Sequence, residues 1–241
     1  MDASQDAYGR LVLDFYEGRP AREIVERDDG DIAANLGPGN YFAPVRRWPA
    51  VERRALRLVR GRVLDVGGGP GRVALELQRR GREVVSIDVS PLAVEVAQRR
   101  GVKDARVLGL DDVDDRLGSF DSVVMFGNNF GLFGSAAGAR RRLRRLARVT
   151  TPGARIVAAS NDPTATDLPE HLAYQRRNVE RGRLPGQLRL RVRHRTYTSA
   201  WFDYLIVTPE EMAALAESGG WHLERTIQAE GSLYVGILEK T

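Results

Sequence analysis

Two aspartates and a run of glycines have the residue types and the spacing of a ligand-binding site. Asp65 stands just before the glycine-rich run at 67–71, and Asp88 follows further along the chain. Because glycine has no side chain, the backbone of such a run can approach a ligand closely, and a helix that begins there offers unpaired N–H groups to polar atoms. A carboxylate at position 65 can accept hydrogen bonds or face a cationic amine, and Asp88 is placed to bind the two hydroxyls of a ribose.

The elements around these residues alternate between β-branched runs and amphipathic helices, which indicates βαβ units and a parallel sheet. We expect strands at 62–66, 83–88, 105–110, 120–126 and 154–160. Helices are expected from the glycine run to 80, from 91 to 101 with Ser90 as the N-cap, and over 140–148. Asp65 and Asp88 then lie at the carboxyl ends of two strands, where open α/β sheets bind their ligands.

The flanking regions have a different character. Before this core we expect a helix at 4–17, a hairpin with strands at 23–27 and 32–35 around the turn Asp28-Asp29-Gly30, and a helix at 49–59. After it, 187–197 and 201–207 alternate like antiparallel strands, a helix follows at 209–218 with Thr208 as its cap, and 222–229 and 233–239 close the sheet as an antiparallel pair. We expect an N-terminal lid at 1–47 and a main domain at 48–241 with an insertion at about 161–207.

Composition excludes several classes of protein. The 241 residues are 42% hydrophobic and 29% charged, a globular balance, and no apolar run approaches the roughly 20 residues of a membrane span. There is no cysteine, so disulfides, thiolate metal sites and cysteine nucleophiles are excluded, and we expect no metal cofactor. The formal charge of +5 comes from arginine, because Lys103 and Lys240 are the only lysines. We interpret this as a compositional bias, and we expect a cytoplasmic protein that binds neither nucleic acid nor membrane.

Around these residues the sequence resembles the class I S-adenosylmethionine-dependent methyltransferases. Their first motif is an acidic residue that alternates with three glycines, which Asp65, Gly67, Gly69 and Gly71 match position for position. Asp88 matches their acidic residue after the second strand. The resemblance covers about 61–160 and the last thirty or so residues. It implies an α/β, Rossmann-like, doubly wound and mostly parallel sheet with an antiparallel final strand, an N-terminal lid, a C-terminal β/α insertion and S-adenosylmethionine as the cofactor.

The resemblance also implies a set of cofactor-binding residues. An acidic residue near the adenine corresponds to Asp111 or Asp112, and the loop after the fourth strand borders the reactive methyl group. The implied set is Asp65, Gly67, Gly68, Gly69, Gly71, Asp88, Val89, Asp111, Asp112, Gly127 and Asn128.

A nicotinamide enzyme is the alternative interpretation of the glycine run. Gly69, Gly71 and Ala74 also satisfy the G-x-G-x-x-A dinucleotide fingerprint, and Asp88 would serve an NAD ribose equally well. Three features favour the methyltransferase. Asp65 would crowd a pyrophosphate with like charge yet suits a methionine amine, the glycines alternate from Gly67 onward, and the expected final strands are antiparallel.

Few residues indicate the methyl acceptor. The Asn-Asn-Phe run that contains Asn129 resembles the Asn-Pro-Pro-Tyr/Phe motif of amino-group methyltransferases, although both prolines are absent, and a simple loop role is the alternative. His171 and Tyr174 fall in the expected insertion, which in this class often covers the substrate. We therefore treat Asn129, His171 and Tyr174 as candidate substrate-binding residues, with His171 and Asn129 as catalytic candidates. A surface role is the alternative for His171.

Two arginine-rich patterns could meet an acidic partner. One follows the helix at 140–148, and the other consists of Arg189, Arg191, Arg193 and Arg195, which a spacing of two places on one face of a strand. A solvated surface is the simpler interpretation of both. The sequence therefore favours methyl transfer to an oxygen or nitrogen atom of a small molecule. A methyltransferase acting on RNA or protein and a non-catalytic cofactor-binding protein are the alternatives, and the oligomeric state stays open.

Overall fold

A computed structural model describes residues 3–34 and 37–241. The described part of the chain divides into two compact units, which are treated separately below. The first comprises Met1–Trp48, Leu64–Gly109 and Arg189–Phe202, and the second Pro49–Val63, Leu110–Leu188 and Asp203–Thr241. Across the described residues, no helix combines the length and the apolar character that crossing a membrane requires. The lid at 1–47 and the insertion at about 161–207 stay predictions as domains.

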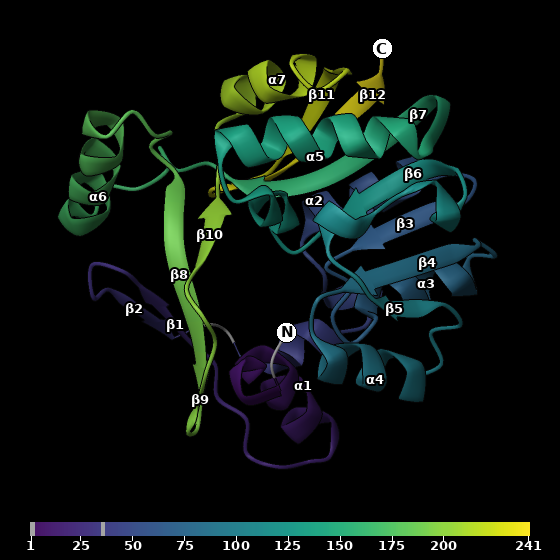
Figure 1. Ribbon diagram of the computed structural model, residues 1–241, viewed down its shortest axis with the longest axis horizontal. Helices are drawn as coiled ribbons and strands as arrows, with labels where there is room; N and C mark the ends of the chain where they lie inside the picture. Colours follow the sequence, from purple (N-terminus) through teal and green to yellow (C-terminus); the bar gives the residue numbers. More distant parts are fainter. Residues whose placement is uncertain (1–2, 35–36) are drawn as a thin grey trace. The chain divides into compact units, whose positions relative to one another are not determined.

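The described residues form a sheet of seven strands in the order β11-β12-β7-β6-β3-β4-β5 (Figure 1). Its strands are β3 (Val63–Val66), β4 (Val84–Asp88), β5 (Ala105–Val107), β6 (Phe120–Met125), β7 (Thr150–Asn161), β11 (Trp221–Gln228) and β12 (Leu233–Lys240). β4 pairs with β5 and β6 with β7 in parallel, whereas β12 runs antiparallel to both β7 and β11. The Rossmann-like sheet with antiparallel final strands is therefore confirmed.

In the first unit, residues with strong local preferences begin the helices α1 (Ala7–Tyr16), α3 (Arg72–Arg79) and α4 (Pro91–Arg99). The Asp6 carboxylate accepts a hydrogen bond from the Gly9 backbone N–H and so caps α1. Ser90 caps α4 through the Ala93 N–H, as the sequence predicts, and Pro91 fills the first helical position. The expected strand 105–110 ends earlier, at Val107, because a 3₁₀-helix forms at Leu110–Asp112.

A second sheet joins the N-terminal hairpin to strands between residues 187 and 205, which are predicted as parts of two separate segments. Its five strands, all within the described residues, are β1 (Ile24–Arg27), β2 (Ile32–Ala34), β8 (Gln187–His194), β9 (Tyr197–Thr198) and β10 (Phe202–Leu205). The hairpin β1–β2 forms where it is expected, although position 35 lies outside the described residues. β1 also pairs antiparallel with β8, so the strands of the N-terminal hairpin and of the later segment lie side by side in Figure 1.

The second unit carries the helices α2 (Ala50–Ala55), α5 (Ala136–Arg148), α6 (Pro169–Glu180) and α7 (Pro209–Glu217). α5 begins four residues before the expected start because Ser135 caps it through the Gly138 N–H. Thr208 and Glu211 form a reciprocal capping box at α7, which accounts for the predicted start of that helix. α6 was not expected. It begins at Pro169 in a polar segment whose apolar pattern gives little helical signal.

Candidate active site

The glycine-rich loop links β3 to α3 in the first unit, and its backbone explains the alternating glycines. Gly67, Gly69 and Gly71 have positive φ angles of 68°, 52° and 83°, a region that residues with a side chain rarely adopt. The Gly67 and Gly68 N–H groups donate to the Ile87 carbonyl at 2.9 and 3.1 Å, which joins the loop to β4. The loop is thus an ordered turn in which Gly67 and Gly68 are half-buried and Gly69 and Gly71 are buried.

Gly68 has to be glycine for a different reason, because there is no space for a side chain at this position. Its φ is not positive, but a Cβ there would overlap the Ser86 hydroxyl and lie 2.9 Å from an Asp65 carboxylate oxygen. The loop therefore rests directly on the side chains of β3 and β4, with no room for a methyl group.

We predict that Gly68→Ala lowers the melting temperature sharply, because overpacking typically costs about 1–3 kcal/mol, equivalent to a shift of several degrees. Gly39→Ala is the matched control, since Gly39 has no positive φ and an added Cβ there would meet no atom closer than Phe15 at 3.8 Å. Adding Ser86→Ala to Gly68→Ala should recover much of the loss in a thermal melt. Equal melting temperatures for Gly68→Ala and the wild type would contradict this account.

Asp65 lies buried beneath the loop, with a relative exposure of 2%. Its Oδ2 accepts a hydrogen bond from the Ser86 hydroxyl at 3.1 Å. The pKa of the Asp65 carboxyl is raised to about 7, chiefly by burial; the Ser86 hydrogen bond and the charge of Arg72 lower it, and the nearby Asp88 adds to the rise. At neutral pH this carboxyl therefore sits near the midpoint of its titration, where a cationic ligand would draw it into the ionised form.

Asp88 ends β4 and binds the loop through both carboxylate oxygens. Oδ2 accepts a hydrogen bond from the Gly69 N–H and Oδ1 one from the Ser90 N–H, both at 2.9 Å. Burial also raises the pKa of this carboxyl. Each carboxylate oxygen has a second lone pair, so Asp88 can still accept hydrogen bonds from two hydroxyl groups. The next residue, Val89, is half exposed and offers an apolar surface beside it.

The structure thus brings Asp65, Asp88 and the glycine loop together within the first unit, as the sequence predicts. The remaining candidates belong to the second unit. Asp111 and Asp112 are exposed in the 3₁₀-helix Leu110–Asp112. The Asp111 carboxylate accepts hydrogen bonds from Arg142 at 2.6 and 3.1 Å, and these hold its pKa below the usual value. Of the two, Asp112 is therefore the less constrained candidate for a ligand.

The loop after β6 is shaped by its own hydrogen bonds. The Gly127 N–H donates to the buried carboxylate of Glu52 at 2.6 Å. Asn128 has a positive φ of 67°, its Oδ1 accepts the Asn161 N–H at 2.8 Å, and its carbonyl accepts the Tyr204 hydroxyl at 2.6 Å. Asn128 thus fixes the loop, and its side-chain NH₂ is the group left to face a ligand.

The candidate acceptor-binding residues lie on two elements of the second unit. Asn129 is the first residue of the 3₁₀-helix Asn129–Phe133, whereas His171 and Tyr174 are on α6. The His171 Nδ1 lies 3.2 Å from the Thr166 hydroxyl, and Tyr174 is buried, with the Arg177 guanidinium 5.5 Å from its ring centre.

The arginine row on β8 is largely occupied within the first unit. Arg191 forms a two-pronged ion pair with Glu26, at 2.8 Å for both contacts, and stacks 4.5 Å over the ring of Trp201. Arg193 approaches the same carboxylate at 3.5 Å. The prediction that Arg195 continues the row is wrong, because β8 ends at His194 and Arg195 has a positive φ of 52°; its guanidinium lies 3.3 Å from the buried Asp14. These contacts are those of structural ion pairs.

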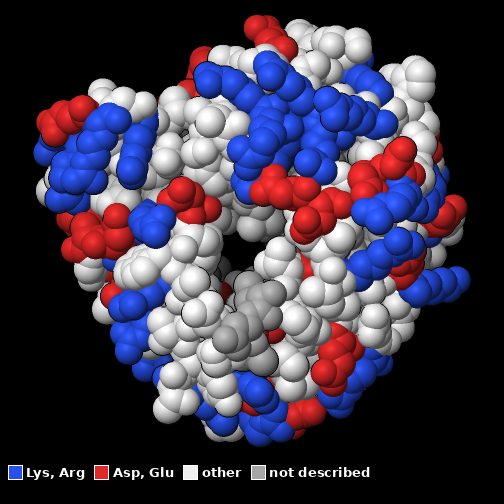
Figure 2. Space-filling model, viewed as in Figure 1, with Lys and Arg blue, Asp and Glu red and all other residues white. Residues whose placement is uncertain are grey.

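The arginines of α5 gather on one face of the molecule, as Figure 2 shows. Arg142 and Arg141 pair with Asp111, and Arg144 and Arg145 donate to backbone carbonyls. Arg140 and Arg148 complete the exposed part of this surface.

The chain matches one family model and is similar to several known proteins. Residues 63–153 match the family described as Methyltransferase domain. The chain is 41% identical over 68 residues to the magnesium-protoporphyrin O-methyltransferase of Rhodobacter capsulatus, covering 26% of this chain and 30% of that protein. It is 39% identical over 75 residues to a ubiquinone biosynthesis O-methyltransferase of Xanthomonas oryzae, covering 29% of this chain and 31% of that protein. The matched stretch thus spans less than a third of these curated relatives.

The structural similarity extends over the whole chain. A SAM-dependent methyltransferase from Bacteroides fragilis, solved in complex with S-adenosyl-L-homocysteine, is 28% identical with a TM-score of 0.85, covering 100% of this chain and 97% of that one.

Proposed function

We propose that this chain, which belongs to the class I S-adenosylmethionine-dependent methyltransferases, transfers the methyl group of that cofactor to an oxygen or nitrogen atom of a small molecule. One observation carries the proposal. A buried carboxyl and a second carboxyl that accepts a hydrogen bond from the loop backbone lie beside the glycine turn, on a fold similar over its full length to a methyltransferase with a bound cofactor product.

The residues of the first unit fit this cofactor chemically. S-adenosylmethionine combines an amino acid, a sulfonium and a nucleoside. Asp88 supplies an acceptor for the ribose hydroxyls, the loop supplies main chain free of side chains, and Asp65 supplies a carboxyl that favours a nearby cation. A dinucleotide would instead place its pyrophosphate next to the Asp65 carboxyl, which like-charge repulsion disfavours.

The protein's part in such a reaction is chiefly orientation. The cofactor supplies a methyl group already activated by its sulfonium, so the chain has to hold the nucleophile in line, which can contribute about 7–11 kcal/mol. A general base is needed where the acceptor is a hydroxyl or a protonated amine. We propose His171 and Asn129 for the acceptor side, with Tyr174 as an apolar contact.

A small acceptor is favoured over RNA by the ion pairs of the arginines. Two arginines of β8 are paired with Glu26 and Arg195 is paired with Asp14, which leaves fewer cationic groups for phosphates. The two curated relatives are O-methyltransferases by name, which supports a small molecule as the class of acceptor.

The test has two steps. Saturating S-adenosylhomocysteine should raise the melting temperature by several degrees, since a ligand at 100 times its Kd stabilises the native state by about 2.7 kcal/mol, whereas NADH should leave it unchanged. The protein is then incubated with a metabolite extract and cofactor carrying a deuterated methyl group. A labelled small molecule in the mass spectrum supports the proposal. A shift with NADH alone, or label found only in RNA or protein, overturns it.

A further inference from the structure

The buried carboxylate of Asp6 joins the N-terminal helix α1 to the start of α4. Asp6 Oδ1 accepts the Gly9 N–H at 2.8 Å, which caps α1. Its Oδ2 accepts the Ser90 hydroxyl at 2.9 Å and the Leu92 N–H at 3.3 Å, at the start of α4. Because the Ser90 N–H also donates to Asp88, the hydrogen bonds run without a break from α1 to the carboxylate at the edge of the glycine loop.

The helices α1 and α4 pack closely at Gly9. A Cβ at Gly9 would overlap the Ser90 hydroxyl and the Asp6 carboxylate, so α1 lies directly against the start of α4. At the other end of α1, the buried Asp14 carboxylate lies 2.9 Å from His194 Nε2, whose Nδ1 lies 3.0 Å from the Arg22 carbonyl. Burial alone would raise the pKa of Asp14, but the hydrogen bonds from His194 and Arg19 lower it.

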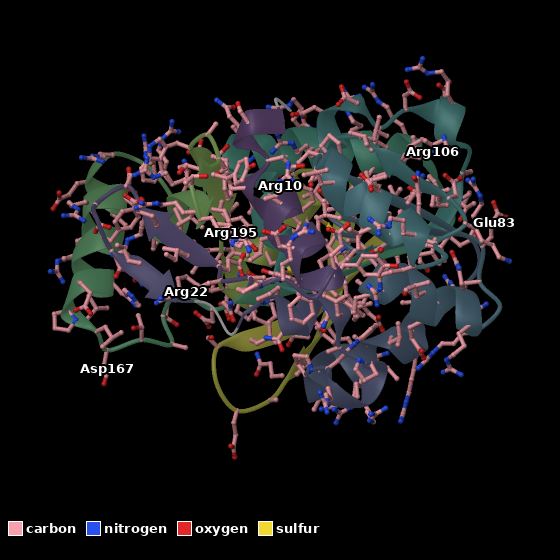
Figure 3. The ribbon with its side chains drawn as sticks, turned by 90° about the horizontal axis from the view of Figure 1, so that it is seen from below. Arg10, Arg22, Glu83, Arg106, Asp167 and Arg195 are labelled. Carbon is pink, nitrogen blue, oxygen red and sulfur yellow. The ribbon has the colours of Figure 1, made fainter. Side chains whose placement is uncertain are left out.

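Figure 3 labels Arg22 and Arg195, whose backbone and side chain flank this pair. α1 is therefore held at both ends within the first unit.

This placement brings one phenol to the glycine loop. The Tyr8 hydroxyl lies 2.5 Å from the position that a Cβ at Gly69 would take. Its ring meets the Tyr41 ring edge-on at 5.4 Å, and the Tyr41 hydroxyl is held by Glu23 at 2.9 and 3.0 Å. Burial raises the pKa of Tyr8, so the hydroxyl keeps its proton. Among the described residues, this hydroxyl has no hydrogen-bond partner.

A guanidinium lies on the same side of the first unit. Arg72 is the first residue of α3 and stacks 4.5 Å over the Trp48 ring, and its positive charge acts on the Tyr8 phenol against the negative charges of Asp88 and Glu23. A phenol O–H donor near a guanidinium suits an anion. S-adenosylmethionine has one anionic group, its α-carboxylate.

We propose that α1 forms one wall of the cofactor site, where Tyr8 donates a hydrogen bond to the amino-acid carboxylate of S-adenosylmethionine and Asp6 is the positioning residue that holds the helix there. The inference rests on the proposed function, because it takes the same cofactor on the same loop. It extends that function to residues of the N-terminal segment that no sequence motif marks.

Tyr8→Phe removes only the hydroxyl, and a hydrogen bond to a charged group accounts for on the order of tenfold to hundredfold in affinity. We expect the Kd for S-adenosylhomocysteine, measured by calorimetry on the full chain, to rise by that factor. The Kd for 5′-methylthioadenosine, which lacks the amino-acid part, should stay unchanged. Tyr16→Phe, on the same helix but exposed, is the matched control and should change neither value.

Asp6→Ser separates positioning from folding, because serine also caps helices but is too short to reach Ser90 as well. We expect a melting temperature within a few degrees of the wild type and a raised Kd for S-adenosylhomocysteine. Tyr8→Phe added to Asp6→Ser should then cause little further loss, since the helix no longer presents the hydroxyl.

The outcomes are distinguishable. If the wild type binds S-adenosylhomocysteine and Tyr8→Phe binds it equally well or more tightly, the inference is wrong and the proposed function stands. An equal loss of affinity for both ligands in Tyr8→Phe also overturns the assignment to the carboxylate. A wild type that binds neither ligand removes both the inference and the proposed function.

Discussion

Asp65→Asn is expected to remove most of the pH dependence of cofactor binding and, at the same time, to stabilise the ligand-free protein above pH 7. Both effects follow from the burial that raises the pKa of this carboxyl to about 7. A cationic ligand favours the ionised form, so below pH 7 the wild type has to release a proton on binding. Its affinity should therefore fall up to about tenfold for each pH unit below the pKa.

The sign of the stability effect is opposite to that of an ordinary ion-paired aspartate. The pKa of Asp65 lies above its unfolded value of 3.8. Between about pH 4 and pH 7 the folded chain therefore binds a proton that the unfolded chain has lost. The contribution of this proton to stability is complete below pH 4 and is lost as the pH rises to about 7. For a pKa raised from 3.8 to about 7, the loss is on the order of 4 kcal/mol. An asparagine does not titrate, so the Asp65→Asn variant does not lose this stability as the pH rises.

The measurement is the Kd for S-adenosylhomocysteine and the free energy of unfolding, each from pH 5.5 to 8.5, for wild type and variant. Taking the difference between the two proteins cancels the titration of the ligand's own amine. Asp104→Asn is the matched control, because Asp104 is paired with Arg106 and belongs to the opposite end of the strand pair β4–β5. Parallel pH profiles for wild type and Asp65→Asn would refute the assigned role.

Asp88→Ala should weaken cofactor binding by about a hundredfold or more. The change removes the acceptor proposed for two ribose hydroxyls, and hydrogen bonds to a charged group contribute about 1.5–3 kcal/mol each. It also frees the Gly69 and Ser90 N–H groups that Asp88 now holds. Asp88→Asn should be nearly as damaging, because its NH₂ group would face one of these N–H donors.

A ligand pair tests whether the loss comes from the ribose. A dideoxyribose analogue of S-adenosylhomocysteine should bind the wild type weakly, and Asp88→Ala should weaken it little further. Isothermal titration of both ligands to both proteins gives the coupling directly. Asp104→Ala, the same loss of charge on the same sheet, should leave both affinities intact. If the analogue loses as much affinity as the natural ligand on Asp88→Ala, Asp88 acts on the loop and not on the ribose.

The geometry of the glycine loop and of the strand ends was predictable because local backbone geometry is encoded by residue type. The positive φ angles at Gly67, Gly69 and Gly71 favour glycine. Ser90 and Thr208 are N-cap residues, so each predicts where its helix begins. A carboxylate at the end of a strand needs no long-range information to be placed. These features depend on a few neighbouring residues, which is the range over which a single sequence is informative.

The N-terminal contribution was not predictable, because it depends on contacts between distant residues. Tyr8 on an amphipathic helix reads as an ordinary core aromatic, and nothing local indicates that it meets Gly69. The Asp6 cap has a local signal, but its bond to Ser90 does not. Likewise, alternation in β8 predicts a strand but not its partner, and the arginines in it find Glu26 only through pairing with β1.

The pairing of β1 with β8 also constrains when the first unit can be completed on the ribosome. Glu26 and Arg191 are 165 positions apart, and the first unit is assembled from three separate stretches that end at Phe202. The hairpin β1–β2 emerges early in synthesis and has to wait for most of the chain before its partner strand exists. Such long loop closures slow folding and leave a strand edge exposed meanwhile. Slower translation before β8 should therefore lengthen the interval in which a nascent chain needs a chaperone.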